Sequence, residues 1–450
     1  MASYNPGETG THAMAYIDTY YRRTIADDTQ RAQLRGEVAA EVCIVGGGLA
    51  GLSTALDLAR AGRKVVVVEA ERVAWGASGR NGGFVGPGYS TSLAHVERMV
   101  GREPAHALHR MSIEGAEIVR ANIAELGIES ANPVSGKISV IRHDDPDSLK
   151  RTQERMERDF AYRLDFMPRE EVRAVLKSKK YHQALFNRQA FHFHPLNYAR
   201  ALATEIEKRG GLIFEDSPVL GAAVDQPEKR VRTAGGGTVR AQHVVFTGGG
   251  YTTNVLPILR RSHLPIATYV LLTEEAPDRI AEAIGCPYAI SDARRAGDYY
   301  RLVDGGRRIL WGGRITTRTT EPGDLAQLLR RTMVSTYPQL AGIRIEAAWS
   351  GLMSYARHLM PQIGRLREGV WYAQGFGGHG MNTTSIGGRV VAEAITGESD
   401  RIRLFEPFGL TWNGGPFGLA AAQLTYWMYQ AQDQWRERNG WSTRAPRSVG

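Results

Sequence analysis

The chain has 450 residues, 42% of them hydrophobic and 23% charged, so it is globular and long enough for two or three hydrophobic cores. Its net charge of +9 is spread along the sequence without a basic run interleaved with aromatic residues, so no nucleic-acid partner is expected. The two isolated cysteines, Cys43 and Cys286, offer no disulfide framework, and the N-terminus lacks the basic and apolar segments of a secretory signal. We therefore expect a cytoplasmic protein.

After an extended arm over residues 1–36 comes the most informative stretch of the chain. A strand over 42–45 leads into Gly46, Gly48 and Gly51 and then into a helix. Gly46 permits the tight turn, Gly48 lets backbone amides approach a pyrophosphate, and Gly51 lets the helix pack closely on the sheet. The pattern therefore predicts a dinucleotide-binding unit.

Glu69 ends the second strand of this unit, at roughly the ~20-residue distance from the glycines that places a carboxylate on the ribose hydroxyls. The intervening helix, over residues 49–61, directs its positive N-terminus at the phosphates. Because an acid at this position repels a 2′-phosphate, NAD or FAD is favoured over NADP.

The next segment, residues 72–89, is a loop with glycines at six positions, which is typical of backbone lying against a flat or charged group. Residues 93–127 and 148–180 are predicted to be helical and to begin a second domain. His192 and His194 resemble a metal pair, but no further ligands lie near them in sequence, so we expect packing at a helix start and no metal.

The chain then returns to the first domain. Residues 195–208 are predicted to form a helix that begins at a proline, followed by a strand over 212–214. A buried strand over 244–247 ends on Gly248 and Gly249, which bring the backbone back towards the nucleotide. Strands over 268–273, 299–303 and 309–312 and a helix over 324–337 follow. They predict a sheet-based substrate domain.

A second glycine-rich turn, over 375–381, lies between a strand at 370–374 and a helix at 382–395. The N-terminus of such a helix would stabilise the negative charge that gathers at one edge of a flavin ring on reduction. Nicotinamide needs no such partner. FAD is therefore favoured over NAD, and an NAD-dependent dehydrogenase is a distant alternative.

Residues 407–432 carry no charge, but glycines, Pro416 and polar side chains interrupt them, so no helix here is expected to span a membrane. The helix predicted to follow Pro416 places Leu419, Leu424 and Trp427 among polar neighbours. We expect it to pack on the body of the protein, with contact to a membrane surface as the alternative.

Together these elements predict an α/β fold: a Rossmann-like FAD-binding domain with a sheet-based α+β substrate domain inserted discontinuously. The expected segments are 36–92, 194–262 and 349–400 for FAD binding, 93–193 and 263–348 for substrate, and 401–450 for a C-terminal helix and tail.

Several motifs resemble those of the D-amino-acid-oxidase-type FAD oxidoreductases. The most specific are Ala77-Ser78-Gly79-Arg80-Asn81-Gly82-Gly83 and Gly378-His379-Gly380. The likeness extends over about residues 36–435. It implies FAD contacts from the following residues: Gly46, Gly48, Leu49, Ala50, Gly51, Glu69, Ala70, Arg72, Ala77, Ser78, Gly79, Arg80, Asn81, Gly82, Val219, Gly248, Gly249, Gly378, His379, Gly380 and Met381.

Two departures from the family pattern concern the segment from Trp349 to Met353. Some members attach FAD through a cysteine there, and this chain has none, so FAD is expected to be non-covalent. Others place there an arginine that forks onto the α-carboxylate of the substrate, where this chain has Met353. The substitution favours an amine or polyamine-derived substrate over an α-amino acid, although another arginine could compensate.

The resemblance implies oxidation of a C–N bond by hydride transfer to FAD, hydrolysis of the imine, and return of the electrons to oxygen as hydrogen peroxide. Tyr269, Tyr300, Trp349 and Met353 are the expected walls of the pocket for a small-molecule amine. Two alternatives stay open. One is a D-amino acid or N-methyl amino acid dehydrogenase that passes electrons to a membrane quinone, with the C-terminal helix as its contact. The other is a non-catalytic FAD-binding redox sensor.

Overall fold

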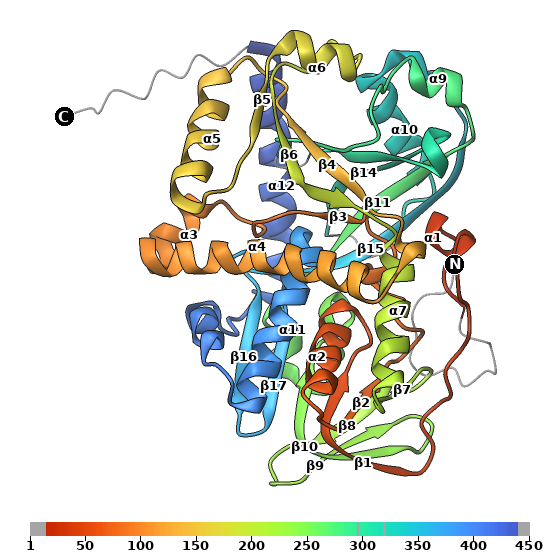
Figure 1. Ribbon diagram of the computed structural model, residues 1–450, viewed down its shortest axis with the longest axis vertical. Coiled ribbons are helices and arrows are strands. Elements are labelled where there is room, and N and C mark those ends of the chain that lie inside the picture. Colours follow the sequence, from red (N-terminus) through yellow and green to blue (C-terminus); the bar gives the residue numbers. More distant parts are fainter. Residues whose placement is uncertain (1–14, 295–296, 318–320, 440–450) are drawn as a thin grey trace.

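The computed structural model describes residues 15–294, 297–317 and 321–439, and it contains two large sheets that lie one above the other in Figure 1. The first sheet has the order β16-β17-β10-β1-β2-β7, with β9 paired to β10 and β8 to β9. Its strands are β1 (Glu37–Val45), β2 (Val65–Val68), β7 (Leu212–Phe214), β8 (Val219–Ala223), β9 (Lys229–Thr233), β10 (Thr238–Phe246), β16 (Gln362–Arg367) and β17 (Val370–Gln374). This confirms the predicted α/β fold class.

Three helices cover one face of this sheet: α2 (Leu49–Arg60), α7 (Pro195–Lys208) and α11 (Gly380–Thr396). Small residues lie where α2 and α11 cross. A Cβ atom on Gly388 of α11 would lie 2.6 Å from the Cβ of Ser53 on α2. The two helices therefore touch at the backbone, which only glycine at this position allows.

The second sheet has the order β15-β11-β14-β13-β12-β4-β6-β3, with β5 paired to β6. Its strands are β3 (Phe84–Val85), β4 (Val134–Val140), β5 (Asp165–Met167), β6 (Ala184–His192), β11 (His263–Thr273), β12 (Ala289–Asp292), β13 (Tyr299–Val303), β14 (Arg308–Thr316) and β15 (Ile345–Ala356). Helices around it are α5 (Pro146–Phe160), α6 (Arg169–Val175), α9 (Pro277–Ala281) and α10 (Leu325–Thr336).

The remaining helices include α1 (Tyr20–Arg23), α3 (Leu93–Val100), α8 (Pro257–Arg260), α12 (Gly415–Asn439) and α4 (Arg102–Glu125), which runs between the two sheets in Figure 1. The predicted helix over 93–127 is broken at Gly101, whose φ of 84° ends α3. The continuous helix expected over 148–180 is wrong, because β5 separates α5 from α6 and pairs with β6. The segment boundaries stay a prediction, and β15 runs through the one placed between residues 348 and 349.

The two histidines that resemble a metal pair serve separate structural roles. His194 caps α7, its Nδ1 accepting from the Asn197 N–H at 3.1 Å. The Nε2 of His192 donates to the carbonyl of Pro287 at 2.9 Å, and its Nδ1 accepts from Arg301 at 2.9 Å. Each ring nitrogen thus has a defined partner that the neutral imidazole satisfies.

Removal of His192 should change how stability depends on pH. Burial, then the charge of Arg301, lowers the pKa of His192 to about 3, whereas an unfolded histidine titrates near ~6.5. The stability from its neutral ring is therefore complete above about pH 6.5 and is lost as the pH falls towards 3. The free energy of unfolding of the parent and of His192→Gln is measured in urea at about pH 7.5 and at about pH 5.5. We expect the loss of stability between these two pH values to be smaller in His192→Gln than in the parent, by roughly 1 kcal/mol. Equal slopes would contradict the assignment.

Candidate cofactor and substrate site

Both glycine-rich turns open onto the same edge of the first sheet. β1 runs parallel to β2 and β10, and β10 runs parallel to β17, with Val45 beside Phe246 and Phe246 beside Tyr372. The carboxyl ends of these strands therefore lie in a row, which is where open α/β sheets bind their ligands. The turns at Gly46 and Gly375 both leave from this row.

The first turn is as tight as its glycines imply. Gly46 has a φ of 111°, and a Cβ atom there would lie 2.9 Å from Thr247 Oγ1. A Cβ on Gly51 would lie 2.0 Å from the carbonyl oxygen of Gly46, so the start of α2 presses directly on the turn. Leu49 and Ala50, in the first turn of α2, are buried with it. The backbone N–H groups of this helix start thus face the carboxyl edge.

Glu69 lies against the glycine turn. One carboxylate oxygen accepts from the N–H of Gly47 at 2.5 Å, and the other accepts from the N–H of Glu71 at 3.0 Å. Burial raises the pKa of Glu69. The segment after β7 runs beside Glu69, since Ser217 N donates to its carbonyl at 2.8 Å, and this brings the start of β8 at Val219 to the same edge as Glu69 and Ala70.

The glycine-rich loop after β2 folds over the start of α2. Ser78 Oγ accepts from the N–H of Leu49 at 2.9 Å. The Asn81 side chain closes the loop on itself, donating to Ala77 O at 2.8 Å and accepting from Gly83 N at 2.7 Å. Gly79 has no room for a side chain, because a Cβ atom there would lie 2.3 Å from Ala74 O. A Cβ atom on Gly82 would likewise lie 2.7 Å from the ring of Tyr299.

Arg80 is held rigidly within this loop. Its guanidinium lies 4.2 Å from the Trp75 ring and donates to the Trp75 carbonyl at 2.8 Å. Desolvation lowers its pKa. Its own carbonyl accepts from the indole of Trp349 at 2.8 Å, so the loop is joined to β15 of the second sheet.

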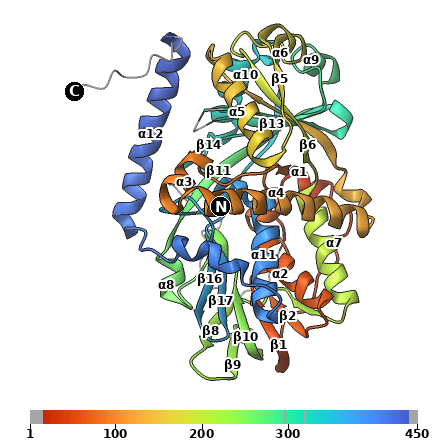
Figure 2. The same ribbon diagram turned by 60° about the vertical axis from the view of Figure 1, so that its left-hand side comes forward.

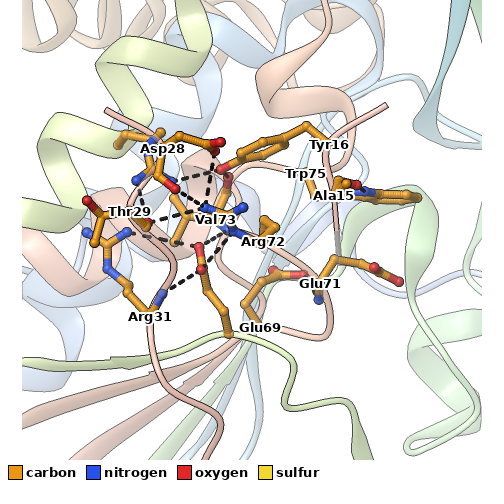
Figure 3. Close-up of polar contacts among 12 residues, drawn as sticks. Ala15, Tyr16, Asp28, Thr29, Arg31, Glu69, Glu71, Arg72, Val73 and Trp75 are labelled. Carbon is orange, nitrogen blue, oxygen red and sulfur yellow. Dashed lines mark hydrogen bonds and ion pairs between the residues drawn. The ribbon is translucent and has the colours of Figure 1, made fainter. Parts of the chain in front are cut away.

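The side chain of Arg72 is engaged with other parts of the protein. It forms an ion pair with Glu215 at 2.9 Å and donates to the carbonyls of Asp28 and Thr29, and it lies over the ring of Tyr16 (Figure 3). These partners come from the N-terminal arm and from the segment after β7. Arg72 therefore anchors the arm, and only its backbone remains available to the site.

The turn after β10 reaches the second sheet. Gly248 and Gly249 lead into a short 3-10 helix whose Tyr251 hydroxyl accepts from the N–H of Leu352 on β15 at 3.3 Å. A Cβ atom on Gly250 would lie 2.7 Å from Leu352 O. These contacts hold the Met353 segment of β15 next to the carboxyl edge.

The second glycine turn lies against Ser90 and β15. The N–H of Gly378 donates to Ser90 Oγ at 2.9 Å, and a Cβ atom on Gly378 would lie 3.0 Å from the Tyr355 hydroxyl and 4.0 Å from Met353 Sδ. His379 is accessible to solvent, yet desolvation, with Lys137 second, lowers its pKa to about 4. We infer that a side chain both accessible and densely surrounded in this way lines a cavity.

Three further side chains share this property, and we assign them to the same cavity wall. Lys137, Tyr299 and Tyr355 are each partly accessible, while desolvation lowers the pKa of Lys137 and raises those of the two tyrosines to about 12. The first turn of α11 closes one end, with Gly380 starting the helix and Met381 buried. No sequence motif indicated these three residues.

Two of the expected pocket residues lie elsewhere. Tyr300 is completely buried between the second sheet and α10, stacked on Trp311 at 4.1 Å with its hydroxyl bonded to those of Tyr181 and Tyr337. Tyr269 belongs to the same buried cluster. Because successive side chains of a strand point to opposite faces, Tyr299 is the residue of β13 that faces the cavity. Trp349 is buried too, and Met353 is partly accessible beside Gly378.

Within the described residues, no group of three or more His, Cys, Asp or Glu side chains is arranged to hold a metal ion.

Comparison with known proteins identifies the family. Residues 41–394 match the family described as DAO, FAD-dependent oxidoreductase. The chain belongs to this family. Gamma-glutamylputrescine oxidoreductase of Escherichia coli (strain K12) is 34% identical over 392 residues, covering 87% of this chain and 91% of the relative. The probable oxidoreductase OrdL of Haemophilus influenzae is 31% identical, with the same two coverages.

The fold is likewise that of DAO-family enzymes. The crystal structure of glycine oxidase from Geobacillus kaustophilus matches with a TM-score of 0.68 over 83% of this chain and 98% of that one, at 20% identity. At this identity the likeness concerns the fold alone. Family membership makes the protein an FAD-dependent enzyme, which resolves the choice between FAD and NAD.

Replacement of Gly48 by valine should abolish FAD binding. A Cβ atom there already lies 3.0 Å from Ser78 Oγ, and the valine methyl groups would occupy the approach to the N–H groups at the start of α2. We expect folded but colourless protein, measured by the ratio of visible flavin absorption to protein absorption and by circular dichroism. Gly323→Val is the control, because nothing lies within 4 Å of a Cβ atom at that position. Normal flavin content in Gly48→Val would contradict the assignment.

Proposed function

We propose that this enzyme oxidises the C–N bond of an amine, polyamine-derived or another alkylamine, with oxygen as the electron acceptor. FAD, when bound, accepts the hydride from the carbon next to nitrogen and passes the electrons on to oxygen as peroxide. The observation that carries the proposal is the place of the second glycine turn, where Gly378 lies against Met353 and Tyr355 of β15. Tyr299 faces Tyr355, and a substrate beside these residues would lie next to the N-terminus of α11.

The residues around the two turns fit FAD. We propose that the Gly46–Gly51 turn and the start of α2 bind the pyrophosphate, that Glu69 binds the ribose, and that the backbone at Val219 faces the adenine. Loop residues 77–82 and the turn of His379 would hold the ring system. The start of α11 presents N–H groups that stabilise negative charge at the pyrimidine edge.

Around the substrate, the chain supplies shape and dryness, and His379 supplies an uncharged ring. Because the pKa of His379 is about 4, its ring is uncharged at neutral pH and does not repel a protonated amine on arrival. Aromatic walls at Tyr299 and Tyr355 exclude water and orient an alkyl chain. Proximity and orientation, with no dedicated acid or base, are the contribution that we assign to this pocket.

We further propose that FAD is held without a covalent bond. Both cysteines of the chain are buried away from the cavity, Cys43 within the first sheet and Cys286 in the core of the second. Acid or heat precipitation of the purified protein should therefore release all the flavin into the supernatant, quantified by its fluorescence. Yellow colour retained in the washed precipitate would contradict this proposal.

A second candidate function is oxidation of an amino acid, and one residue favours it. Lys137 stands in the cavity wall, and no hydrogen bond or ion pair of its ammonium is found among the described residues. It could pair with a substrate carboxylate in place of the missing arginine at Met353. The relative from Escherichia coli is named for an amine, which supports the first candidate.

Anaerobic reduction of the flavin decides between these candidates. We expect mono-, di- and acylated polyamines to bleach the bound flavin faster than D-amino acids, N-methyl amino acids or free α-amino acids do. Met353→Arg should raise the relative rate with α-amino acids by about tenfold to hundredfold, the value of a charge-assisted pair. Lys137→Met, which removes the charge of the ammonium, is the second variant to be compared with the unmodified enzyme.

Each outcome has a distinct meaning. Fastest reduction of the unmodified enzyme by α-amino acids, lost in Lys137→Met, would replace the amine proposal with the second candidate. No bleaching by any amine would leave a redox sensor. Oxygen uptake with peroxide release on admitting air distinguishes an oxidase from a dehydrogenase that needs a quinone, and an oxygen electrode measures the uptake.

A further inference from the structure

The C-terminal helix α12 presents an apolar face to the outside of the molecule. It lies along one flank of the structure beside β11 and β14 (Figure 2). Its outward side chains include the largest exposed apolar groups of the described chain. They are Phe417, Leu424, Trp427, Met428 and Trp435, with 83%, 61%, 57%, 50% and 57% of their surface exposed.

The opposite side of α12 is fixed to the body by polar contacts, so the helix cannot simply turn its apolar face inward. Before the helix starts, the N–H of Asn413 donates to Arg261 O at 2.8 Å. In the middle, Gln423 accepts from the N–H of Thr317 at 3.1 Å. Near the end, Glu437 forms an ion pair with Arg142 at 3.6 Å. Contacts before the start, in the middle and near the end of α12 thus determine which face of the helix is exposed.

Six of the exposed residues of α12 follow a heptad spacing, and the exposed Trp427 lies beside this row. Exposed residues occur at positions 417, 421, 424, 428, 431 and 435, which alternate steps of four and three. They are Phe417, Ala421, Leu424, Met428, Ala431 and Trp435. This is the spacing of the a and d positions by which one helix packs against another. The seam would be about 27 Å long at 1.5 Å per residue.

The seam is also complementary to itself in the antiparallel direction. Reversed about position 426, Phe417 meets Trp435, Ala421 meets Ala431, and Leu424 meets Met428. Large side chains then face large ones and small face small, and each layer pairs an a position with a d position. A two-fold axis requires this kind of self-complementary surface.

We propose that two copies of the protein associate through α12, antiparallel, with the two-fold axis next to position 426. Charge supports a protein partner over a lipid surface. Helices that lie on membranes carry lysine and arginine along their polar face. Residues 407–432 have no charged side chain, and the two arginines of α12, Arg436 and Arg438, occur only in its last turn, next to Glu437 in sequence. The inward face of α12 is engaged with β11 and β14.

The first test is molecular mass in solution. Multi-angle light scattering of the FAD-loaded protein at micromolar concentration should give twice the chain mass of 49.6 kDa. Leu424→Glu should give the monomer mass with unchanged flavin content and unchanged rate of flavin reduction. Leu220→Glu is the matched control, because Leu220 is 64% exposed on β8, and it should remain a dimer.

The second test is the register of the pair. In the double variant Ala421→Cys and Ala431→Cys, mild oxidation should link two chains, seen as a doubled mass on a non-reducing gel. Each single variant should stay unlinked, because the two copies of one position would lie about 15 Å apart, beyond the reach of a disulfide. The native cysteines are buried and do not compete.

Three results would overturn the proposal: a monomeric parent protein, a Leu424→Glu variant that keeps the parent's mass, or linking of the single Ala421→Cys variant, which indicates parallel helices. A monomer that sediments with anionic lipid vesicles would assign the face to a membrane.

Discussion

The site depends on the backbone contact between α2 and α11. Gly388 brings the two helices together at Ser53, closer than any side chain would permit. Since both helices follow parallel strands of one sheet, their N-termini emerge at the same edge. Two helix N-termini, from segments more than 300 residues apart in sequence, therefore lie at one edge of the sheet. A cofactor with a phosphate at one end and a ring at the other can engage both.

The surroundings of this contact are built to keep the glycine-rich loop in place. Arg80 joins the loop to Trp349 of the second sheet. Arg72 joins it to Glu215 after β7 through a buried ion pair, and to the carbonyls of Asp28 and Thr29 in the N-terminal arm. Breaking a buried pair of this kind costs about 3–5 kcal/mol, because the remaining charge has no partner. Contacts with other segments of the protein therefore hold the glycine-rich loop rigid.

The walls of the cavity are determined by strand geometry. Along β13, Tyr299 faces the cavity and Tyr300 the core, and a shift of one residue would exchange them. Along β15, Met353 and Tyr355 lie on the same face at the period of two. Substrate preference thus rests on the register of two strands, and the lysine of β4 is the one cation we place in that wall.

The sequence by itself determined the nucleotide fold and the cofactor turns, because their causes are local. A glycine is needed where the backbone must turn or approach, and the predicted helix over 195–208 and the strand over 370–374 match α7 and β17. Only the tertiary structure decided the rest. Strand register decides which tyrosine of a neighbouring pair lines the cavity. Contacts with distant segments decide which partner Arg72 takes and which face of α12 remains exposed. No local sequence pattern encodes the register or these contacts.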